Sequence, residues 1–361
     1  MNFTINTDNL KEMVGKAVYC VSNNKLIPIT SLMSIKVKDG ILSLTTTDAT
    51  NYFYVNSKDK VDCEDFEVSV VADIFAKLIQ KTTSEVVMLS VDNNILEVKG
   101  NGTYKLELPL ENGQPIKFLN KLPKEEPEVS TTIKRTIIDH ILNYNKTALA
   151  VDLSIPSCCS YYCGDKVITS DRFKVCLTDV NLFDKKLLIT PQVMELLSIM
   201  SEENINVSFN DEYSIFWTNT DTLYAPITAG VETFPVDALN NLAESDFPST
   251  CKVSRMAVLE MLERLSLFVS SYDKKAITLS FTEEGIMFSS KKSNGTELVP
   301  YIESDNFVPY VCPIDIEFFK SQIAVQEGDN IELSYGSDIA IKMKINNVIQ
   351  IVALIDETEE Q

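Results

Sequence analysis

The side chains able to carry out acid–base or nucleophilic chemistry form no recognisable catalytic pattern in this sequence. The only histidine, His140, lies in the apolar-periodic stretch TIIDHILNYN. One histidine cannot build a multi-histidine metal site, and on a predicted helix it is more often a surface or half-buried residue than a proton carrier. The motifs GxGxxG, GxxxxGK, HExxH and GxSxG do not occur. We therefore expect no catalytic residue, no cofactor and no metal.

Three of the eight cysteines, Cys158, Cys159 and Cys163, are clustered in the stretch CCSYYCG. Adjacent residues of a predicted strand point to opposite faces, and no CxxC pair or histidine lies nearby, so the cluster does not fit a zinc site. We expect free, mostly buried thiols in a reducing compartment. The other cysteines are scattered singly in apolar segments, at Cys20, Cys63, Cys176, Cys251 and Cys312.

The elements that would position any functional residue recur three times along the chain. A short strand entering an apolar-periodic helix begins at Phe3, Ser130 and Ser249, and a strand, a short helix and two alternating strands begin at Phe66, Lys186 and Tyr310. The apolar period changes from about 3.6 to about 2 within each copy. The pattern predicts helices over 7–20, 72–83, 134–150, 190–202, 254–269 and 313–323.

These repeats predict an α+β protein of three homologous domains, each with two helices packed on antiparallel sheets. We expect domain 1 at 1–122, a linker at 123–129, domain 2 at 130–244, and domain 3 at 245–361 with an acidic C-terminal tail. An apolar content of 45% is enough to fill such cores. The sequence has no apolar run of membrane-spanning length and MNFTINTDNL does not resemble a signal peptide, so we expect a cytoplasmic protein.

The formal net charge of −20 is unevenly distributed. The six predicted helices hold ten basic and ten acidic residues, which leaves 22 of the 32 basic and 42 of the 52 acidic residues elsewhere. Helices gathered on one surface could therefore face a polyanion. Charged strand edges and loops that only maintain solubility would give the same distribution, and charge alone does not separate the two interpretations.

Several stretches, together with the threefold repeat, resemble the bacterial beta sliding clamp, the DNA polymerase III beta subunit. MNFTINTDNLKEMV and NNKLIPITSLMSIKVKDGILSLTTTDAT are similar to the first clamp repeat, including Thr47 and Asp48. KVITSDRFKVCL from Lys166 resembles the strand and loop of the second repeat, and VETFPVDALNNL from Val231 resembles the connector into the third domain. The resemblance covers the full length. It implies a DNA-clamp fold and a processivity factor for DNA replication that tethers the replicative polymerase.

Helix packing requires a dimer if the chain encircles double-stranded DNA. A duplex is roughly 20 Å wide and neighbouring helices lie about 8–10 Å apart, so six helices line a circle under about 20 Å across. Twelve helices from two chains give roughly 35 Å, enough for a duplex and water. The expected assembly is therefore a head-to-tail homodimeric ring.

The candidate residues follow from these two arguments. Sequence-independent phosphate contacts are expected from basic residues on the helices and in the turn after the first. The resemblance implies four dimer-interface residues, which could instead be core residues of single domains. The DNA-facing candidates are Lys11, Lys16, Lys25, Lys77, Lys81, Lys134, Arg135, Lys146, Arg255, Arg264 and Lys320, and the interface candidates are Tyr104, Leu106, Phe268 and Val269.

The resemblance also implies a hydrophobic pocket between domains 2 and 3, where DNA polymerase and clamp loader dock through short linear motifs. The TSDRF loop is one residue shorter than in the family and lacks the histidine before its arginine, and Leu354 and Asp356 replace a proline and a basic residue. These departures, with only four arginines among 32 basic residues, predict a divergent member; a phage or plasmid source stays open. The pocket residues are Thr169, Arg172, Phe173, Leu177, Leu242, Val352, Leu354 and Ile355.

Two other classes of function fit parts of the sequence. A Cys- or carboxylate-dependent hydrolase is disfavoured by the lack of histidines and by repeats that share no polar motif. An acidic protein-binding scaffold, or a DNA-mimicking inhibitor without a ring, fits the net charge but not the neutrality of the helices. The native mass and low-resolution shape of the protein would separate these classes from a clamp.

Overall fold

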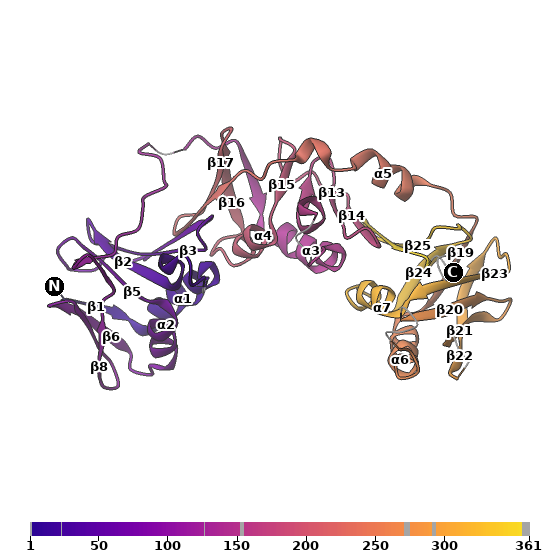
Figure 1. The fold of residues 1–361 in the computed structure, drawn as a ribbon, viewed down its shortest axis with the longest axis horizontal. Helices are drawn as coiled ribbons and strands as arrows, with labels where there is room; N and C mark the ends of the chain where they lie inside the picture. The colour runs from indigo at the N-terminus through magenta and orange to yellow at the C-terminus, as the bar shows by residue number, and fades with distance from the viewer. Residues whose placement is uncertain are drawn as a thin grey trace. The chain divides into compact units, whose positions relative to one another are not determined.

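The computed structural model describes residues 2–22, 24–125, 127–151, 155–270, 275–290 and 294–355. Its helices and antiparallel sheets form the predicted α+β fold (Figure 1). The chain divides into two compact units: unit 1 contains residues 1–138 and 192–227, and unit 2 contains residues 139–191 and 228–361. Each unit holds one predicted terminal domain and part of predicted domain 2. The division into three domains stays a prediction.

Unit 1 is built on a four-stranded and an eight-stranded antiparallel sheet, with one separate two-stranded pair. Its strands are β1 (Asn2–Asn6), β2 (Leu32–Lys38), β3 (Ile41–Thr47), β4 (Tyr52–Asn56), β5 (Phe66–Val71), β6 (Val86–Asp92), β7 (Ile95–Lys99), β8 (Thr103–Glu107), β9 (Leu110–Glu111), β10 (Gln114–Pro115), β11 (Thr131–Lys134), β16 (Asn204–Phe209), β17 (Tyr213–Trp217) and β18 (Asp221–Pro226). The strand orders are β1-β6-β7-β8, β10-β9 and β11-β16-β17-β18-β4-β3-β2-β5. Because β18 pairs with β4, the larger sheet continues from predicted domain 1 into predicted domain 2.

Unit 2 contains one twelve-stranded sheet of order β15-β12-β13-β14-β26-β25-β24-β19-β22-β21-β20-β23. Its strands are β12 (Tyr161–Cys163), β13 (Val167–Ser170), β14 (Lys174–Thr178), β15 (Leu187–Ile189), β19 (Ser249–Ser254), β20 (Ala276–Phe281), β21 (Gly285–Ser290), β22 (Thr296–Asp305), β23 (Tyr310–Asp315), β24 (Asn330–Tyr335), β25 (Ala340–Ile345) and β26 (Val348–Ala353). Pairing of β14 with β26 carries this sheet from predicted domain 2 into predicted domain 3.

Six α-helices of the described chain correspond to the six predicted ones. They are α1 (Thr7–Ala17), α2 (Ala72–Lys81), α3 (Arg135–Asn145), α4 (Pro191–Ser198), α6 (Arg255–Ser266) and α7 (Ile316–Ala324). In Figure 1, α1 lies beside α2 in unit 1 and α6 lies beside α7 in unit 2. The side chains of Asn6, Ser254 and Asp315 accept backbone hydrogen bonds at the starts of α1, α6 and α7, which satisfies N–H groups that have no partner within the helix.

A further helix, α5 (Val236–Glu244), lies in the stretch that we expected to be only a connector. Val236, Leu239 and Leu242 recur at helical spacing and pack against a cluster of the sheet that includes Leu177. The run spans little more than two turns, so its periodicity is too short to stand out in the sequence. Five 3-10 turns complete the described elements: η1 (Val18–Cys20), η2 (Pro28–Ser31), η3 (Lys146–Ala148), η4 (Pro156–Cys159) and η5 (Val231–Thr233).

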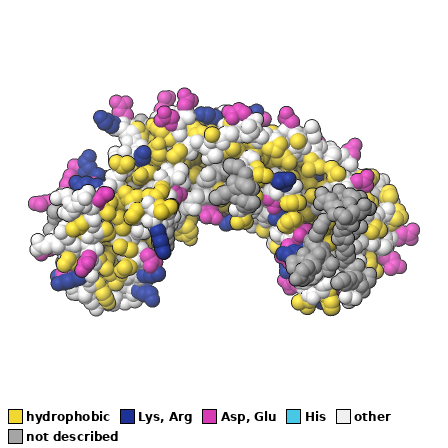
Figure 2. Space-filling view, viewed as in Figure 1, with side chains coloured by type: hydrophobic (Ala, Val, Ile, Leu, Met, Phe, Trp, Pro, Cys, Tyr) yellow, Lys and Arg dark blue, Asp and Glu magenta, His cyan; other side chains and the backbone are white. Residues whose placement is uncertain are grey.

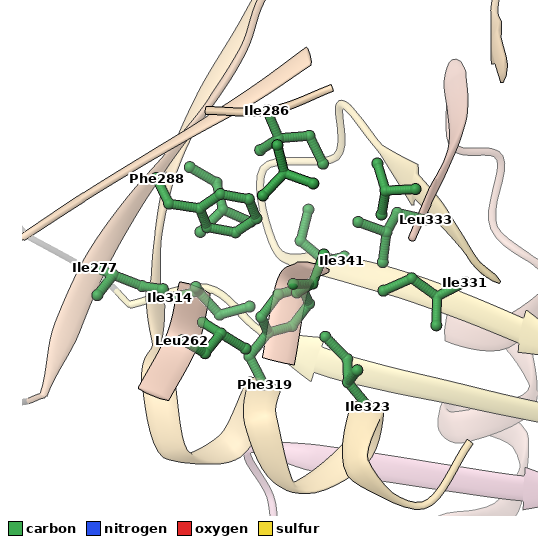
Figure 3. Close-up of a cluster of buried hydrophobic side chains, with 14 of the residues drawn as sticks. Leu262, Ile277, Ile286, Phe288, Ile314, Phe319, Ile323, Ile331, Leu333 and Ile341 are labelled. Carbon is green, nitrogen blue, oxygen red and sulfur yellow. The ribbon is translucent and has the colours of Figure 1, made fainter. Parts of the chain in front are cut away.

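The core of predicted domain 3 shows how the repeated pattern folds (Figure 3). Leu262 of α6 and Phe319 and Ile323 of α7 pack onto strand residues such as Phe288 and Leu333. Burial of each such side chain stabilises the fold by about 1.5–3 kcal/mol. The apolar face of both helices therefore lies on the sheet, as the change of period predicts.

All eight cysteines are free thiols. The prediction that Cys158 and Cys159 lie in a strand is wrong, because the chain forms the 3-10 turn η4 there and β12 begins only at Tyr161. Within the described ranges, no group of three or more His, Cys, Asp or Glu residues could hold a metal ion. No helix of the described chain is long and apolar enough to cross a membrane.

Candidate interaction surfaces

The same turn occurs at both places where a sheet continues from one repeat into the next. Asp48 Oδ1 accepts a hydrogen bond from the N–H of Thr50 at 2.8 Å, and Asp171 Oδ1 accepts one from the N–H of Phe173 at 3.0 Å. The residue after each aspartate has a positive φ, 87° in the first turn and 80° in the second. An aspartate that bonds its own backbone two residues on stabilises such a turn.

The side chain two positions after the aspartate distinguishes the second turn from the first. Phe173 is 55% exposed, and its ring stacks on that of Phe318 with centroids 5.6 Å apart. Lys174 Nζ lies 4.7 Å from the centre of the Phe318 ring and 3.2 Å from Asp171 Oδ2. The cation and the carboxylate therefore fix one ring of the stack, and the other ring remains available to an apolar side chain of a partner.

The end of β26 lies beside this aromatic pair. The N–H of Ala353 donates to the carbonyl of Phe173 at 2.8 Å, and the N–H of Leu354 donates to the carbonyl of Ile339 at 2.9 Å. Ile339 is 59% exposed, so apolar surface extends beyond the two rings. We call this surface the Phe173 patch; it consists of Phe173, Phe318, Ile339, Leu354 and Ile355.

The prediction that all eight pocket residues line one slot is wrong. Leu177 and Leu242 belong to the cluster on one face of the sheet, whereas Val352 belongs to the core on the other face. The cause is strand alternation: Val352 is opposite Lys174 in the pairing of β14 with β26, and Leu177 lies an odd number of residues further along. In the structure Thr169, Leu177 and Val352 are buried, Leu242, Leu354 and Ile355 are half-buried, and Arg172 and Phe173 are exposed.

The sequence analysis missed Phe318, Lys174 and Ile339. Phe318 is followed by a second phenylalanine, and only Phe319 is fully buried, while Phe318 lies at the edge of the same core and is partly exposed. The pair of adjacent phenylalanines was the one available signal. Its contact with Phe173 depends on the pairing of β14 with β26 and has no signature in residue spacing. Asp356 and the acidic run that begins at Glu357 lie outside the described residues.

Two strand edges, one in each unit, are further candidate surfaces. In the described chain, β8 pairs on one side only, with β7, and the first half of β22 pairs only with β21. The expected interface residues Tyr104 and Leu106 lie on β8, where Tyr104 is 45% exposed and Leu106 is half-buried. Beside β8 is a hollow lined by Lys77, Leu78, Lys81, Thr82, Asn101 and Tyr104.

The other two expected interface residues lie beyond the end of α6. Phe268 is 54% exposed, while Val269 is half-buried and packs against the core of predicted domain 3. A Cβ placed on Gly295, just before β22, would lie 3.2 Å from the Phe268 ring, so this ring lies against the start of β22. Arg264 pairs with Glu297 of β22 at the same corner. The exposed residue is therefore Phe268, and Val269 contributes to the core.

The expected DNA-facing cations differ in how freely they could meet a phosphate. Lys16 is only 14% exposed, and its ammonium lies 2.9 Å from Glu12 and 3.4 Å from the fully buried Asp221. Lys16 thus holds α1 against β18, and its charge is already neutralised. Arg255 Nε donates to the carbonyl of Gly328 at 2.9 Å.

The remaining cations lie nearer the surface. Acidic and basic side chains are interspersed on the face shown in Figure 2, and three of the candidates form ion pairs of this kind: Lys77 with Asp73, Arg264 with Glu297, and Lys320 with Glu263. Lys25, Lys77, Lys81, Lys134, Lys146 and Arg264 are exposed, and Lys11, Arg135, Arg255 and Lys320 are half-buried. Exposed ion pairs are weak, so they leave these cations able to exchange partners.

Comparison with known proteins identifies this architecture. The family described as DNA polymerase III beta subunit, N-terminal domain, matches residues 1–115. No curated protein matches the chain by sequence. Among solved structures, the DNA polymerase III beta subunit of Thermotoga maritima is 17% identical with a TM-score of 0.85, over 98% of this chain and 99% of that one.

Two further structures agree. The DNA polymerase sliding clamp of Bacillus subtilis is 17% identical with a TM-score of 0.84 over 99% of both chains, and the DNA polymerase III subunit beta of Borrelia burgdorferi is 16% identical with a TM-score of 0.83 over 99% of this chain and 100% of that one. The resemblance inferred from the sequence is confirmed. Residues 1–115 match the model of the DNA polymerase III beta subunit N-terminal domain, and the whole chain has the fold of the bacterial beta sliding clamps.

Proposed function

We propose that this protein is a sliding clamp: two copies close head to tail around duplex DNA and tether a replicative polymerase for processive synthesis. The observation that carries this proposal is the pair of strand edges left unpaired in the described chain. β18 pairs with β4, and β14 pairs with β26. β8 occupies the place of β18 and β26 in its repeat, and β22 occupies the place of β4 and β14. Joining β8 of one copy to β22 of another would repeat the same joint.

The side chains beside these edges support a heterologous contact. Phe268, half exposed next to β22, is of a size to enter the hollow beside β8 in a second copy. The stems of Lys77 and Lys81 line that hollow, and their ammonium groups would meet the acidic side chains of α6, Glu260 and Glu263. The two contacting surfaces differ, and each copy has one β8 edge and one β22 edge. In a closed dimer both edges of both copies would therefore be paired.

Contact with DNA is proposed for the exposed cations on the helices, apart from Lys77 and Lys81, which the proposed joint would engage, and not for Lys16. Exposed lysines paired loosely with neighbouring acids can give sequence-independent contacts that do not hold one position on the duplex. The overall charge of −20 opposes tight binding, which suits a ring that must move. Retention on DNA would then depend on topology, with phosphate contacts as a minor term.

Polymerase and clamp loader are proposed to dock at the Phe173 patch through a short peptide with apolar anchors. The patch offers an exposed ring, the neighbouring Leu354 and Ile355, and backbone groups at the end of β26, which together suit a peptide of a few residues. We propose no catalytic role for the chain and a cytoplasmic location. A single histidine and the lack of the common catalytic motifs support the first of these proposals.

A topological experiment tests the clamp function. The protein is loaded on nicked circular DNA, washed at high salt, and the DNA is then cut once with a restriction enzyme. A ring survives salt that screens phosphate contacts and leaves only after linearisation. Equal loss from circles and from linear DNA, together with a monomeric native mass, would instead support an acidic protein-binding scaffold.

A further inference from the structure

Lys342 of β25 lies against the C-terminal end of α5. Its Nζ donates to the carbonyl of Ala243 at 3.2 Å and to that of Ser245 at 3.0 Å, and it lies 4.4 Å from the centre of the Phe247 ring. Carbonyls in the last turn of a helix have no partner within the helix, and this end of the helix dipole is negative. One cation therefore caps α5 and holds the residues that follow it.

This arrangement differs from that of an ordinary surface lysine. Burial lowers the pKa of Lys342, so the ammonium loses hydration that its contacts with carbonyls and ring must offset. Lys344 lies on the same face of β25, two residues further on, and is exposed. It makes none of these contacts with α5 in the described chain, and so provides a matched comparison.

The rest of α5 is held mainly by apolar contacts. Its start at Pro235 has no side-chain cap, and Val236, Leu239 and Leu242 pack on the sheet. Apolar burial is not directional, so by itself it permits the helix to shift along the sheet. The two hydrogen bonds from Lys342 are directional, and they fix the end of α5 relative to β25.

We propose that Lys342 is a positioning residue for the partner surface, a proposal that rests on peptide docking at the Phe173 patch. The cluster beneath α5 includes Val175 and Ile351, which lie two residues from Phe173 and Ala353 on the strands that carry the patch. Fixing α5 on this cluster keeps the ends of β14 and β26 in the arrangement that a peptide meets. A released α5 would let those strand ends move and so weaken docking.

The first test measures the helix itself and needs no ligand. Hydrogen exchange of α5 amides is compared in the full chain, Lys342→Met, Lys342→Arg and the control Lys344→Met. Methionine keeps the stem but removes charge-assisted hydrogen bonds, so exchange in the last turn of α5 should quicken roughly tenfold. Arginine should restore most of the protection, and Lys344→Met should leave it unchanged. Equal exchange in Lys342→Met and the native chain would overturn the proposal.

The second test measures docking with a fluorescein-labelled short peptide carrying leucine and phenylalanine anchors. Lys342→Met should weaken its binding several-fold while the exchange of core strands β20 and β24 stays unchanged, and Lys342→Arg should recover it. Faster α5 exchange with unchanged peptide affinity would overturn the positioning role. A native chain that binds no such peptide would overturn docking at the Phe173 patch and thus the positioning proposal, while leaving the capping of α5 intact.

Discussion

Thr46 and Thr169 donate the same hydrogen bond in two successive repeats. Thr46 Oγ1 bonds the carbonyl of Ala17 at the end of α1, and Thr169 Oγ1 bonds the carbonyl of Asn145 at the end of α3, at 2.6 and 2.8 Å. Both threonines are fully buried. In each repeat, the strand that leads into the turn beside the sheet continuation is thus bound to the end of the first helix by an equivalent hydrogen bond. What the repeats share belongs to the scaffold, and what differs between them is where function should be sought.

Phe173 is the clearest such difference, because Thr50 occupies its place in the first repeat. Phe173→Ala should weaken binding of a Leu/Phe peptide by about 2 kcal/mol, roughly thirtyfold, since exposed aromatic anchors dominate small interfaces. Its effect on folding should stay small because the ring is half exposed. Fluorescence anisotropy measures the peptide affinity, and urea unfolding measures the stability of the chain. Thr50→Ala is the matched control, and an equal loss of peptide affinity in both variants would refute the assignment.

Lys16 and Asp221 form a buried ion pair, so we expect Lys16 to act in folding and not on DNA. Lys16→Met leaves the Asp221 carboxylate without its cation and should lower the free energy of unfolding by about 3 kcal/mol. The exposed Lys58, which also pairs with Glu12, gives a control: Lys58→Met should cost under about 1 kcal/mol. Urea titration of both variants decides between the roles. A stable Lys16→Met chain with weakened DNA retention would favour a phosphate contact.

How far the sequence predicts this protein depends on the range of each signal. The six helices and the strand hairpins follow from local periodicity. The Thr47–Asp48 stretch indicates the turn between β3 and β4, because an aspartate side chain can accept hydrogen bonds from the backbone that follows it. The prediction that Leu177 and Val352 line one slot was wrong, because strand alternation places their side chains on opposite faces of the sheet. That register is not known from the sequence. Phe318 and Lys342 could not be predicted, because their contacts join segments far apart in the chain.

Buried thiols should make the protein sensitive to alkaline pH. Burial raises the pKa of Cys20, Cys251 and Cys312 to about 12 from the ordinary 9.0. In the unfolded chain these thiols ionise near pH 9. Their contribution to the free energy of unfolding is therefore complete below that pH and is lost as the pH rises toward 12. Within that pH range, each buried thiol should lower the free energy of unfolding by about 1.4 kcal/mol per pH unit.

The thiol contribution is isolated by comparing variants at two pH values. Urea unfolding near pH 8 and above pH 10 should show a smaller loss of stability for Cys312→Ala than for the native chain. Val311→Ala, an exposed neighbour without a titratable group, should keep the native slope. An unchanged pH dependence in Cys312→Ala would show that this thiol ionises equally in both states.

The acidic run beyond Ile355 should select among partner peptides by charge. Four of the six residues from Asp356 onward are acidic, and Ile355 belongs to the Phe173 patch. Truncation after Ile355 should weaken binding of peptides with Lys or Arg beside their apolar anchors, and it should reduce the fall of their on-rates with salt. Ring assembly should be unaffected. Equal affinities for basic peptides before and after truncation would exclude this role.

The two residues after α6 should respond differently to the same substitution. Phe268→Ser should give folded monomers, because the ring is exposed in the single chain and its burial in a second copy is worth about 1.5–3 kcal/mol at each joint. Val269→Ser should instead lower the stability of the chain itself, since Val269 packs on the core. Analytical ultracentrifugation and thermal unfolding separate these outcomes. Leu26→Ser, at another exposed apolar side chain, should change neither. A dimeric Phe268→Ser variant of native stability would place the joint elsewhere on the chain.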